Sequence, residues 1–313
     1  MPRNEKENMV LRKILLAVIA MLALLMCGCS DTTELGNRAI IEAIAIDFDN
    51  FDEEYKVSAL LFSSSGEKLD PSQENAIKVS GNGKTLSEAI DNISLSDGKR
   101  LYMSETKLLV LGGGFEQENV LPALNALYYD LRCSLNMPVC CAQSAELLTD
   151  IQFIEGMTSA EKPLSMLENA ENLGVSPNTT LLDLLADNAA GRPSLIPFFV
   201  PDKNGRGMTE SGDTISLSGT RRLKSGKLSG TYDQNQTISL MISENKAKTL
   251  SLNFSLGSSE KTCLAYDIRS ELDPNGMVCK VSAKFKSKNG GPLSKEEEIA
   301  ALNELAKIAS KTK

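Results

Sequence analysis

The side chain with the most specific chemistry in this sequence of 313 residues is the thiol of Cys29. Before it come four basic residues, an uncharged apolar run at 14–26 and the small residue Gly28. A helix of that run would reach about 20 Å, which is too short for a hydrocarbon core of about 30 Å. The layout instead predicts a secretory signal peptide at 1–28, cleaved before Cys29. We expect acylation of Cys29, with palmitate for example, to hold the mature chain on a lipid bilayer.

The absence of histidine removes most other chemistry from consideration. Ser-His-Asp and Cys-His catalysis both need an imidazole, and so do many zinc sites. The sequence also contains no specific pair of carboxylates that would suit an acid-dependent hydrolase. We therefore expect a protein that is not an enzyme, with no catalytic residues, no metal site and no cofactor.

Five further cysteines would remain in the mature chain. Cys140 and Cys141 are adjacent in an apolar stretch typical of a strand, so their side chains should point to opposite faces. Cys263 and Cys279 flank a predicted turn, and in a symmetric hairpin they would be offset by about 23 Å, too far for a disulfide. We interpret all five as small, buried apolar side chains: Cys133, Cys140, Cys141, Cys263 and Cys279.

Three other patterns resemble functional motifs but lack the rest of the motif. Acidic residues at 47–54 do not follow the order of a calcium loop, because Phe51 occupies a ligand position, and we interpret them as a solvated hairpin turn. Ser104 and Lys107 match the Ser-x-x-Lys pattern of penicillin-recognising enzymes, whose companion motifs are missing. The glycines at 112–114 lack phosphate-loop spacing, so we interpret them as a strand-to-helix turn where glycine supplies the backbone φ.

The charge of the mature chain is acidic. Cleavage after Gly28 would remove four basic and two acidic residues, so the formal charge would change from −8 to −10. Nucleic-acid binding relies on clustered Lys and Arg that neutralise phosphates, whereas the lysines here are scattered. We therefore expect no nucleic-acid partner.

The pattern of apolar residues predicts strands mixed with helices, which must position these side chains. We expect strands at 38–48, 55–63, 76–80, 107–111, 135–143, 194–201, 215–223, 246–256, 262–272 and 277–286. Helices are expected at 85–95, 116–132, 144–151, 164–173, 179–188, 232–242 and 294–311, and a loop at 64–73. The predicted fold class is α+β, with mixed sheets, helices packed on them, and two or more domains.

The last helix has the clearest local signals. Ser294 is a good N-cap, three glutamates follow it, and lysines gather near the end, as the helix dipole favours. Four apolar residues are expected on its buried face: Ile299, Leu302, Leu305 and Ile308. Loop-forming residues at 202–212 indicate a boundary between an N-terminal α+β domain at 29–201 and a C-terminal α+β region at 202–313.

Several stretches, taken in order, resemble one family. Cys29, Asp31, Glu34 and Asp47 match the start of its pattern, in which a cysteine and acidic residues precede an apolar stretch that ends in Asp; Ser30 stands where Trp is usual. Three more stretches follow in the family's order, at 83–89, 99–112 and 217–230. The sequence thereby resembles the Ger(x)C lipoproteins over most of 29–313.

The resemblance implies a function and partners. Ger(x)C proteins are C subunits of spore nutrient germinant receptors, so it implies a non-enzymatic lipoprotein of spore germination. The implied partners are the integral-membrane A and B subunits, and the implied location is the extracytoplasmic face of the inner spore membrane. Members usually continue past a helix like that at 294–311 into closing strands, so we expect a shortened C-terminal region with an unpaired sheet edge.

A different class of function stays open alongside this one. An extracytoplasmic lipoprotein that binds a small solute for a transporter would have the same signal peptide and the same anchor. It should carry a ligand cleft, and ligand should raise its melting temperature.

Overall fold

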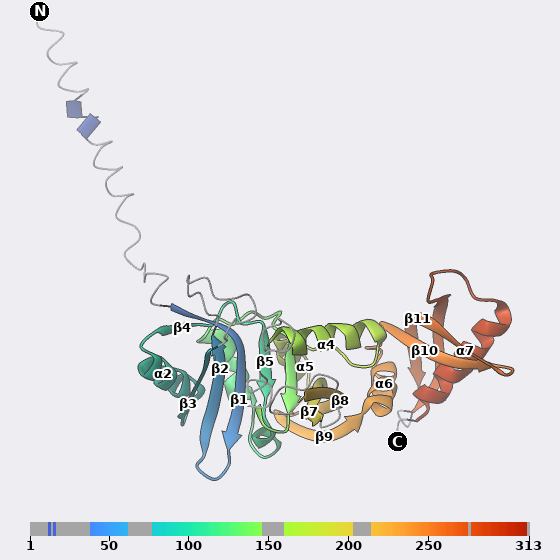
Figure 1. Cartoon of the computed structure of the whole chain (residues 1–313), viewed down its shortest axis with the longest axis horizontal. Helices are drawn as coiled ribbons and strands as arrows, with labels where there is room; N and C mark the ends of the chain where they lie inside the picture. The colour runs from blue at the N-terminus through green and yellow to red at the C-terminus, as the bar shows by residue number, and fades with distance from the viewer. Residues whose placement is uncertain are drawn as a thin grey trace, which may run out of the picture. The chain divides into compact units, whose positions relative to one another are not determined.

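The computed structural model describes residues 12–13, 15–16, 38–61, 77–145, 160–202, 214–274 and 277–311. The chain divides into two compact units, Met1–Arg38 and Ala39–Lys313, and the fold described below lies in the second. Two sheets with helices packed on them make an α+β fold, which confirms the predicted class (Figure 1). Among the described helices, none combines the length and the apolar character needed to cross a membrane.

The larger sheet has nine described strands, ordered β3-β2-β1-β5-β6-β7-β8-β9, with β4 also pairing with β1. Four strands, β1, β5, β6 and β7, are parallel, and antiparallel strands flank them on both sides. Every residue of β5 and β6 is buried, as expected for parallel strands covered on both faces. The strands are β1 (Arg38–Asp49), β2 (Glu54–Leu61), β3 (Ile77–Gly83), β4 (Arg100–Tyr102), β5 (Leu108–Leu111), β6 (Val139–Ala142), β7 (Ser194–Asp202), β8 (Thr214–Lys224) and β9 (Lys227–Asp233).

Helices supply apolar side chains to both faces of this sheet. One face packs against α2 (Leu86–Asp97), α3 (Leu121–Tyr129) and α5 (Leu181–Ala189), and the other against α4 (Glu161–Leu173). Cys141 belongs to the first core and Cys140 to the second, so the prediction that they point to opposite faces is confirmed. Local signals fix these helices. Thr85 caps α2 and Thr180 caps α5 through their side-chain oxygens.

The smaller sheet is antiparallel and ordered β10-β11-β12. Its strands are β10 (Thr249–Leu256), β11 (Ser259–Leu272) and β12 (Val278–Ser287). Helices α6 (Gln234–Ser243) and α7 (Lys295–Ala309) share its apolar core. The predicted N-cap of α7 is confirmed, because Ser294 and Glu297 form a reciprocal capping box.

The buried face of α7 differs in part from the predicted one. Ala301, Leu305 and Ala309 are buried, whereas the side chain of Ile299 is 62% exposed. Ile299 lies about 200° around the helix from Ala301, so the two cannot share a face. Leu305 was predicted correctly, and the expectation for Ile299 was wrong because α7 packs through its alanines.

The helix predicted at 116–132 is also shorter than expected. A short 3₁₀ helix, η2 (Gly113–Glu116), comes first, and α3 begins only at Leu121. The Asn119 side chain accepts a hydrogen bond from the backbone N–H of Leu121, which satisfies a donor of the first turn. Strand β9, which follows β8, was not predicted.

Some predictions fall outside the described residues. They include Cys29, the loop at 64–73 and nearly all of the helix at 144–151. The boundary segment at 202–212 is also almost entirely outside, although β7 and β8 on its two sides pair antiparallel within the larger sheet. The division into 29–201 and 202–313 stays a prediction.

Candidate functional site

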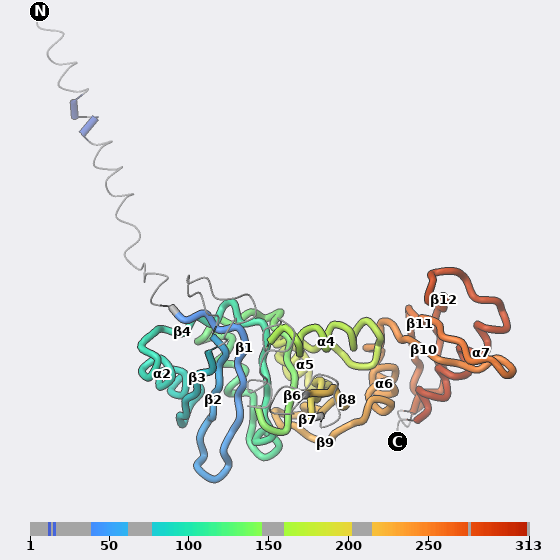
Figure 2. The backbone as a smooth tube through the Cα atoms, in the orientation of Figure 1, coloured from blue at the N-terminus to red at the C-terminus, as the bar shows by residue number. Residues whose placement is uncertain are grey.

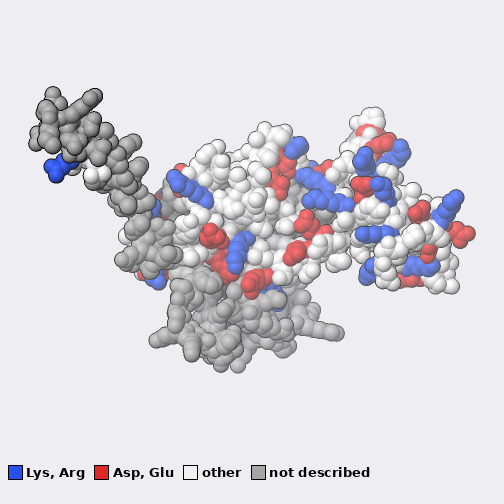
Figure 3. All heavy atoms as spheres, turned by 90° about the horizontal axis from the view of Figure 1, so that it is seen from above, with Lys and Arg blue, Asp and Glu red and all other residues white. Residues whose placement is uncertain are grey.

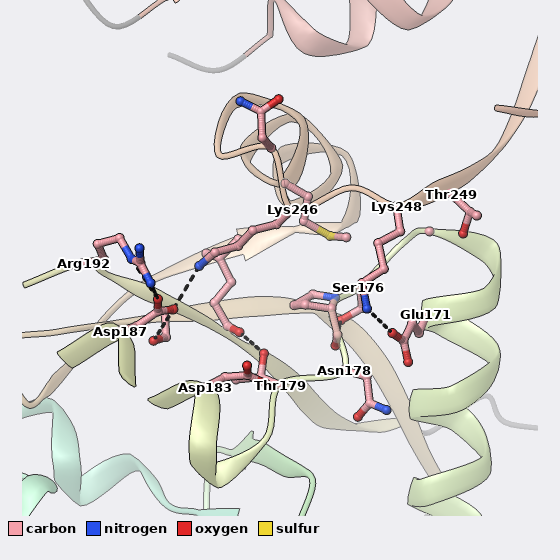
Figure 4. A pocket seen from close by; sticks show the side chains of 16 residues that line it. Glu171, Ser176, Asn178, Thr179, Asp183, Asp187, Arg192, Lys246, Lys248 and Thr249 are labelled. Atoms are coloured by element: carbon pink, nitrogen blue, oxygen red, sulfur yellow. Dashed lines mark hydrogen bonds and ion pairs between the residues drawn. The ribbon is translucent and has the colours of Figure 1, made fainter. Parts of the chain in front are cut away.

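A polar cavity of about 370 Å³ lies where the end of α4 and helix α5 meet the segment that joins α6 to β10 (Figure 4). Its walls are built from residues that are close in space but far apart in sequence. They include Glu171, Ser176, Asn178, Asp187, Arg192 and Lys246. Nothing in the sequence indicated that these residues lie together.

Asp187 is the centre of the charged groups around this cavity. Its carboxylate is buried and accepts hydrogen bonds from Arg192 Nε, Ser194 Oγ and Lys246 Nζ, each at 3.1 Å. Burial on its own raises the pKa of this carboxyl, but the donated hydrogen bonds outweigh it and hold the pKa below its ordinary value. Asp187 is therefore an ionised, fully bonded carboxylate and not a general acid.

The end of α5 brings the first two donors to Asp187. After the helix, Gly191 adopts a left-handed conformation with φ 66°, and the N–H of Arg192 donates to the Asp187 carbonyl oxygen at 2.8 Å. This tight turn returns the chain toward Asp187, so that Arg192 points to its carboxylate (Figure 4). Ser194 follows and donates to the same carboxylate.

The end of α6 brings the third donor. Asn245 has φ 54°, and the N–H of Lys246 donates to the carbonyl oxygen of Met241 at 2.8 Å. The Lys246 ammonium also lies 3.3 Å from Glu244 and 3.4 Å from the Pro193 carbonyl oxygen. One lysine thus connects the segment leading into the smaller sheet with the helix and strand of the larger one.

The end of α4 meets the start of β10 on the other side of the cavity. Gly174 caps α4 with φ 73°, and a Cβ at that position would lie 1.9 Å from the Thr249 carbonyl oxygen. Only glycine allows both the left-handed conformation and this approach. Nearby, Lys248 lies 3.5 Å from Glu171, but its side chain is 84% exposed.

The chemistry of this cavity is that of a junction between elements. The buried charge of Asp187 is matched by its own neighbours. The buried Oδ1 of Asn178, which also lines the cavity, has no hydrogen-bond partner among the described residues. The arrangement can hold α4, α5 and β7 against α6 and β10 through the ion pairs and hydrogen bonds of one buried carboxylate with partly exposed cations.

Asp47, one of the residues that carry the family resemblance, has a related structural role. Its carboxylate accepts from the backbone N–H groups of Phe48 and Gly114 at 2.9 Å and of Ala145 at 3.3 Å. A Cβ at Gly112 would lie 2.0 Å from this carboxylate, and one at Gly114 would lie 1.9 Å from the Phe48 carbonyl oxygen. The predicted turn at 112–114 is present, but the reason given for its glycines was wrong. None of the three has a positive φ, and glycine is needed there because other atoms approach too closely for a Cβ.

The acidic residues between β1 and β2 form the predicted hairpin turn. Asp49 accepts hydrogen bonds from Lys56 and from the backbone of Phe51 and Asp52, which lower the pKa of its carboxyl to about 2. Phe51 is 92% exposed at the tip. No group of three or more potential metal-ligating side chains occurs among the described residues.

Four of the five cysteines are buried as predicted. Burial raises the pKa of the Cys133 and Cys141 thiols to about 12 and that of Cys263 to about 11, so these thiols are protonated and inert. The prediction was wrong for Cys279, which is exposed at a bulge of β12 where its Sγ donates to the Glu271 carbonyl oxygen. All five described cysteines are free, so the bond that the offset excluded is not formed.

The Ser-x-x-Lys match at Ser104 gains no support from the structure. Lys107 lies 3.1 Å from the buried carboxylate of Glu42, so its side chain is engaged in an ion pair with a residue outside the motif.

Comparisons with known protein sequences agree with the family resemblance. Residues 31–201 match the family model described as the spore germination protein N-terminal domain. The chain is 24% identical over 185 residues to spore germination protein B3 of Bacillus subtilis (strain 168), an alignment that covers 58% of this chain and 44% of that protein. The chain is also similar to the crystal structure of the GerBC protein, with 16% identity, a TM-score of 0.46, and coverage of 86% of this chain and 80% of the other.

The family model and the relative differ in how much they cover. The alignment spans less than half of the length of the curated relative. The family model, by contrast, matches more than half of this chain. The chain therefore belongs to the Ger(x)C family of spore germination proteins.

Proposed function

We propose that this chain is the lipid-anchored, non-enzymatic C subunit of a spore nutrient germinant receptor. In this proposal Cys29 carries the acyl chains, and the folded part lies on the extracytoplasmic face of the inner spore membrane. There it acts by contacting the integral-membrane A and B subunits. The observation that carries the proposal is the family match starting at residue 31, two residues after the predicted acylated cysteine.

The charged cavity supports a role in contacts better than a role in catalysis. Asp187 is ionised, buried and fully bonded, so it has no proton to give and no free lone pair directed at a substrate. Buried thiols with a raised pKa make poor nucleophiles. A non-enzymatic subunit needs neither kind of group.

Deleting the gene tests this function. We expect spores of the deletion strain to germinate poorly with the nutrients that the receptor senses, while germination by calcium dipicolinate, which bypasses nutrient receptors, stays normal. Expression of the intact chain should restore the nutrient response. A deletion strain that lacks related C subunits and still responds normally to every nutrient would contradict the proposal.

The alternative, a solute-binding lipoprotein, would use the same cavity. Its volume would accommodate a small solute, but the charges that line it are already paired with each other. A solute would have to displace Lys246 or Arg192 from Asp187, at the cost of an unpaired buried carboxylate. A panel of amino acids, sugars and nucleosides should therefore leave the melting temperature unchanged; a ligand that raises it by several degrees would favour the alternative.

A further inference from the structure

The end of the larger sheet at which β1 begins is the part of the fold nearest in sequence to the proposed anchor. The segment at 30–38 joins Cys29 to Ala39, where the second compact unit begins. Strand β1 has 12 residues and runs about 40 Å from this end to the hairpin at its other end. A fully extended segment of that length would hold the start of β1 within about 35 Å of an acylated Cys29, whereas the hairpin can lie much further away.

The ends of three helices lie at this end of the sheet. Strand β4 pairs with β1 and lies beside its start (Figure 2). It begins at Arg100, just after α2 ends at Asp97. Because β6 is parallel to β5 and β1, it also begins here, and Leu135 and Met137 just before it accept hydrogen bonds from the first residues of α5. Helix α3, which ends at Tyr129, contacts both α2 and α5.

Each of these helices exposes a large apolar side chain at this end. Leu95 in the last turn of α2 is 81% exposed, Tyr129 at the end of α3 is 72% exposed, and Leu182 at the start of α5 is 46% exposed. Leu95 lies about 200° around its helix from the buried Ile93, and Tyr129 lies equally far from the buried Leu127. Both side chains therefore point away from the sheet.

Tyr128 adds to this group, which we call the helix-end surface: Leu95, Tyr128, Tyr129 and Leu182. The rings of Tyr128 and Tyr129 pack edge to face, with centroids 4.6 Å apart. Tyrosine is enriched where lipid headgroups meet acyl chains, because its ring is apolar and its hydroxyl is polar. The composition of the helix-end surface is therefore that of a membrane interface.

The charge around the helix-end surface is nearly balanced. Lys99 and Arg100 follow α2 and Arg132 follows α3, and all three are exposed, while Asp97 and Asp130 lie at the same two helix ends. One excess positive charge is far below the clusters of about four to eight that recognise anionic lipid. Contact with a bilayer would therefore depend on the apolar and aromatic side chains and would not need anionic lipid.

We propose that the helix-end surface lies against the lipid bilayer, with its apolar and aromatic side chains at the level of the headgroups. This inference rests on the proposed anchor at Cys29, which keeps the surface close to lipid. So few side chains would bind a free protein to a membrane only weakly, but a tethered protein meets the bilayer at a high effective concentration. The contact would fix how the fold is oriented on the membrane. A protein partner could also cover these side chains, but the short segment at 30–38 favours lipid.

Tryptophan fluorescence in the acylated full chain tests the proposal, because the wild type contains no tryptophan. Tyr129→Trp places one indole in the helix-end surface. The control, Phe51→Trp, places one at the hairpin beyond the other end of β1, where the phenylalanine is 92% exposed. Each variant is reconstituted into phosphatidylcholine vesicles with plain or brominated acyl chains, since bromine quenches an indole that contacts it. We expect brominated lipid to reduce the emission of Tyr129→Trp and to leave that of Phe51→Trp unchanged.

A second substitution locates the contact. In the Tyr129→Trp chain, Leu95→Glu should reduce the quenching, because a carboxylate at this position opposes insertion among the headgroups. The matched control is Ile299→Glu, at an apolar residue of α7 that is 62% exposed and lies outside the helix-end surface. It should leave the quenching as it was. An unchanged melting temperature verifies that each variant folds.

The mass of the purified chain and its flotation with vesicles separate this inference from the anchor on which it rests. A chain that carries no acyl group at Cys29 and does not float would overturn the proposed anchor and this inference together. If the chain is acylated and floats, but bromine quenches neither indole or both equally, the inference alone is overturned. Quenching of Tyr129→Trp that Leu95→Glu does not change would also overturn it.

Discussion

At Asp187, three donors from two separate segments of the chain converge on one buried carboxylate. Removing one partner of such a cluster leaves charge in a place that water reaches poorly, so the cost exceeds that of a lost surface contact. Lys248 offers a natural contrast, because it pairs with Glu171 on the same cavity while its own side chain is 84% exposed. Substituting each lysine in turn therefore compares the stability that comes from pairing with a buried carboxylate with the stability that comes from an exposed ion pair.

We expect Lys246→Met to destabilise the protein by about 1–3 kcal/mol, because Asp187 then keeps only two of its three side-chain donors. Lys248→Met should change the free energy of unfolding by about 0.5 kcal/mol or less. Urea unfolding of both variants provides the measurement. Equal effects of the two substitutions would show that Asp187 does not depend on Lys246.

The contribution of Asp187 should depend on pH. Its pKa in the folded protein lies below that of the unfolded chain, so its stabilising effect is present above the unfolded value and is lost as pH falls through the folded value. The difference in unfolding free energy between the wild type and Asp187→Asn should stay constant from pH 7 to 5. It should shrink below about pH 4. Unfolding measured across this pH range tests the sign, and a difference that grows toward acid would contradict it.

At the scale of elements, one carboxylate holds the turn from β5 into η2 against the end of β1. Asp47 sits at the end of β1 and binds the backbone of the neighbouring turn, which leaves no room for side chains at Gly112 and Gly114. The parallel pairing of β1 with β5 brings the two segments together. The steric limits at this turn therefore arise from the pairing of β1 with β5, and not from the conformation of the turn alone.

Gly114→Ala should destabilise the fold by about 2–3 kcal/mol, because its Cβ would collide with a backbone oxygen that cannot move freely. The control is Gly291→Ala, where the nearest atom to a Cβ is the flexible Ser287 Oγ at 3.5 Å. That control should stay within about 0.5 kcal/mol of the wild type. Thermal and urea unfolding of both variants provide the comparison, and a harmless Gly114→Ala would refute the close approach.

Local signals predicted the elements, whereas contacts between distant residues could not be predicted. Ser294 and the glutamates after it predicted α7. An apolar stretch predicted β6, with its two cysteines on opposite faces. Nothing in the spacing linked Asp187 to Lys246, since only the packing of α5 against the α6–β10 segment brings them together. The exposure of Ile299 has the same origin, because packing decides which of two apolar stripes faces the sheet.

At the scale of the whole molecule, surface charge and the proposed anchor determine which partners the protein can bind. Lysines, arginines and acidic residues are interspersed over the described surface in Figure 3. An acidic mature chain with mixed surface charge favours protein partners over nucleic acid. If Cys29 is acylated as proposed, those partners are met at a membrane surface.

The proposed acylation of Cys29 predicts a specific difference between two cysteines. Cys29→Ala should abolish metabolic labelling with palmitate and release the chain from membranes, because the acyl chains provide its hydrophobic attachment. Cys279→Ala is the matched control, since Cys279 is the exposed cysteine of the described part of the fold. It should label and fractionate like the wild type. Labelling of the Cys29→Ala protein would place the acylation elsewhere.

Purification of the tagged full chain from detergent-solubilised spore membranes tests the receptor role most directly. Mass spectrometry of the purified material identifies and quantifies the proteins bound to it. If the chain is a receptor C subunit, two different multi-span membrane proteins, the A and B subunits, should be recovered in amounts equal to the chain. Recovery of the chain alone, or with a permease and its ATPase, would contradict that role.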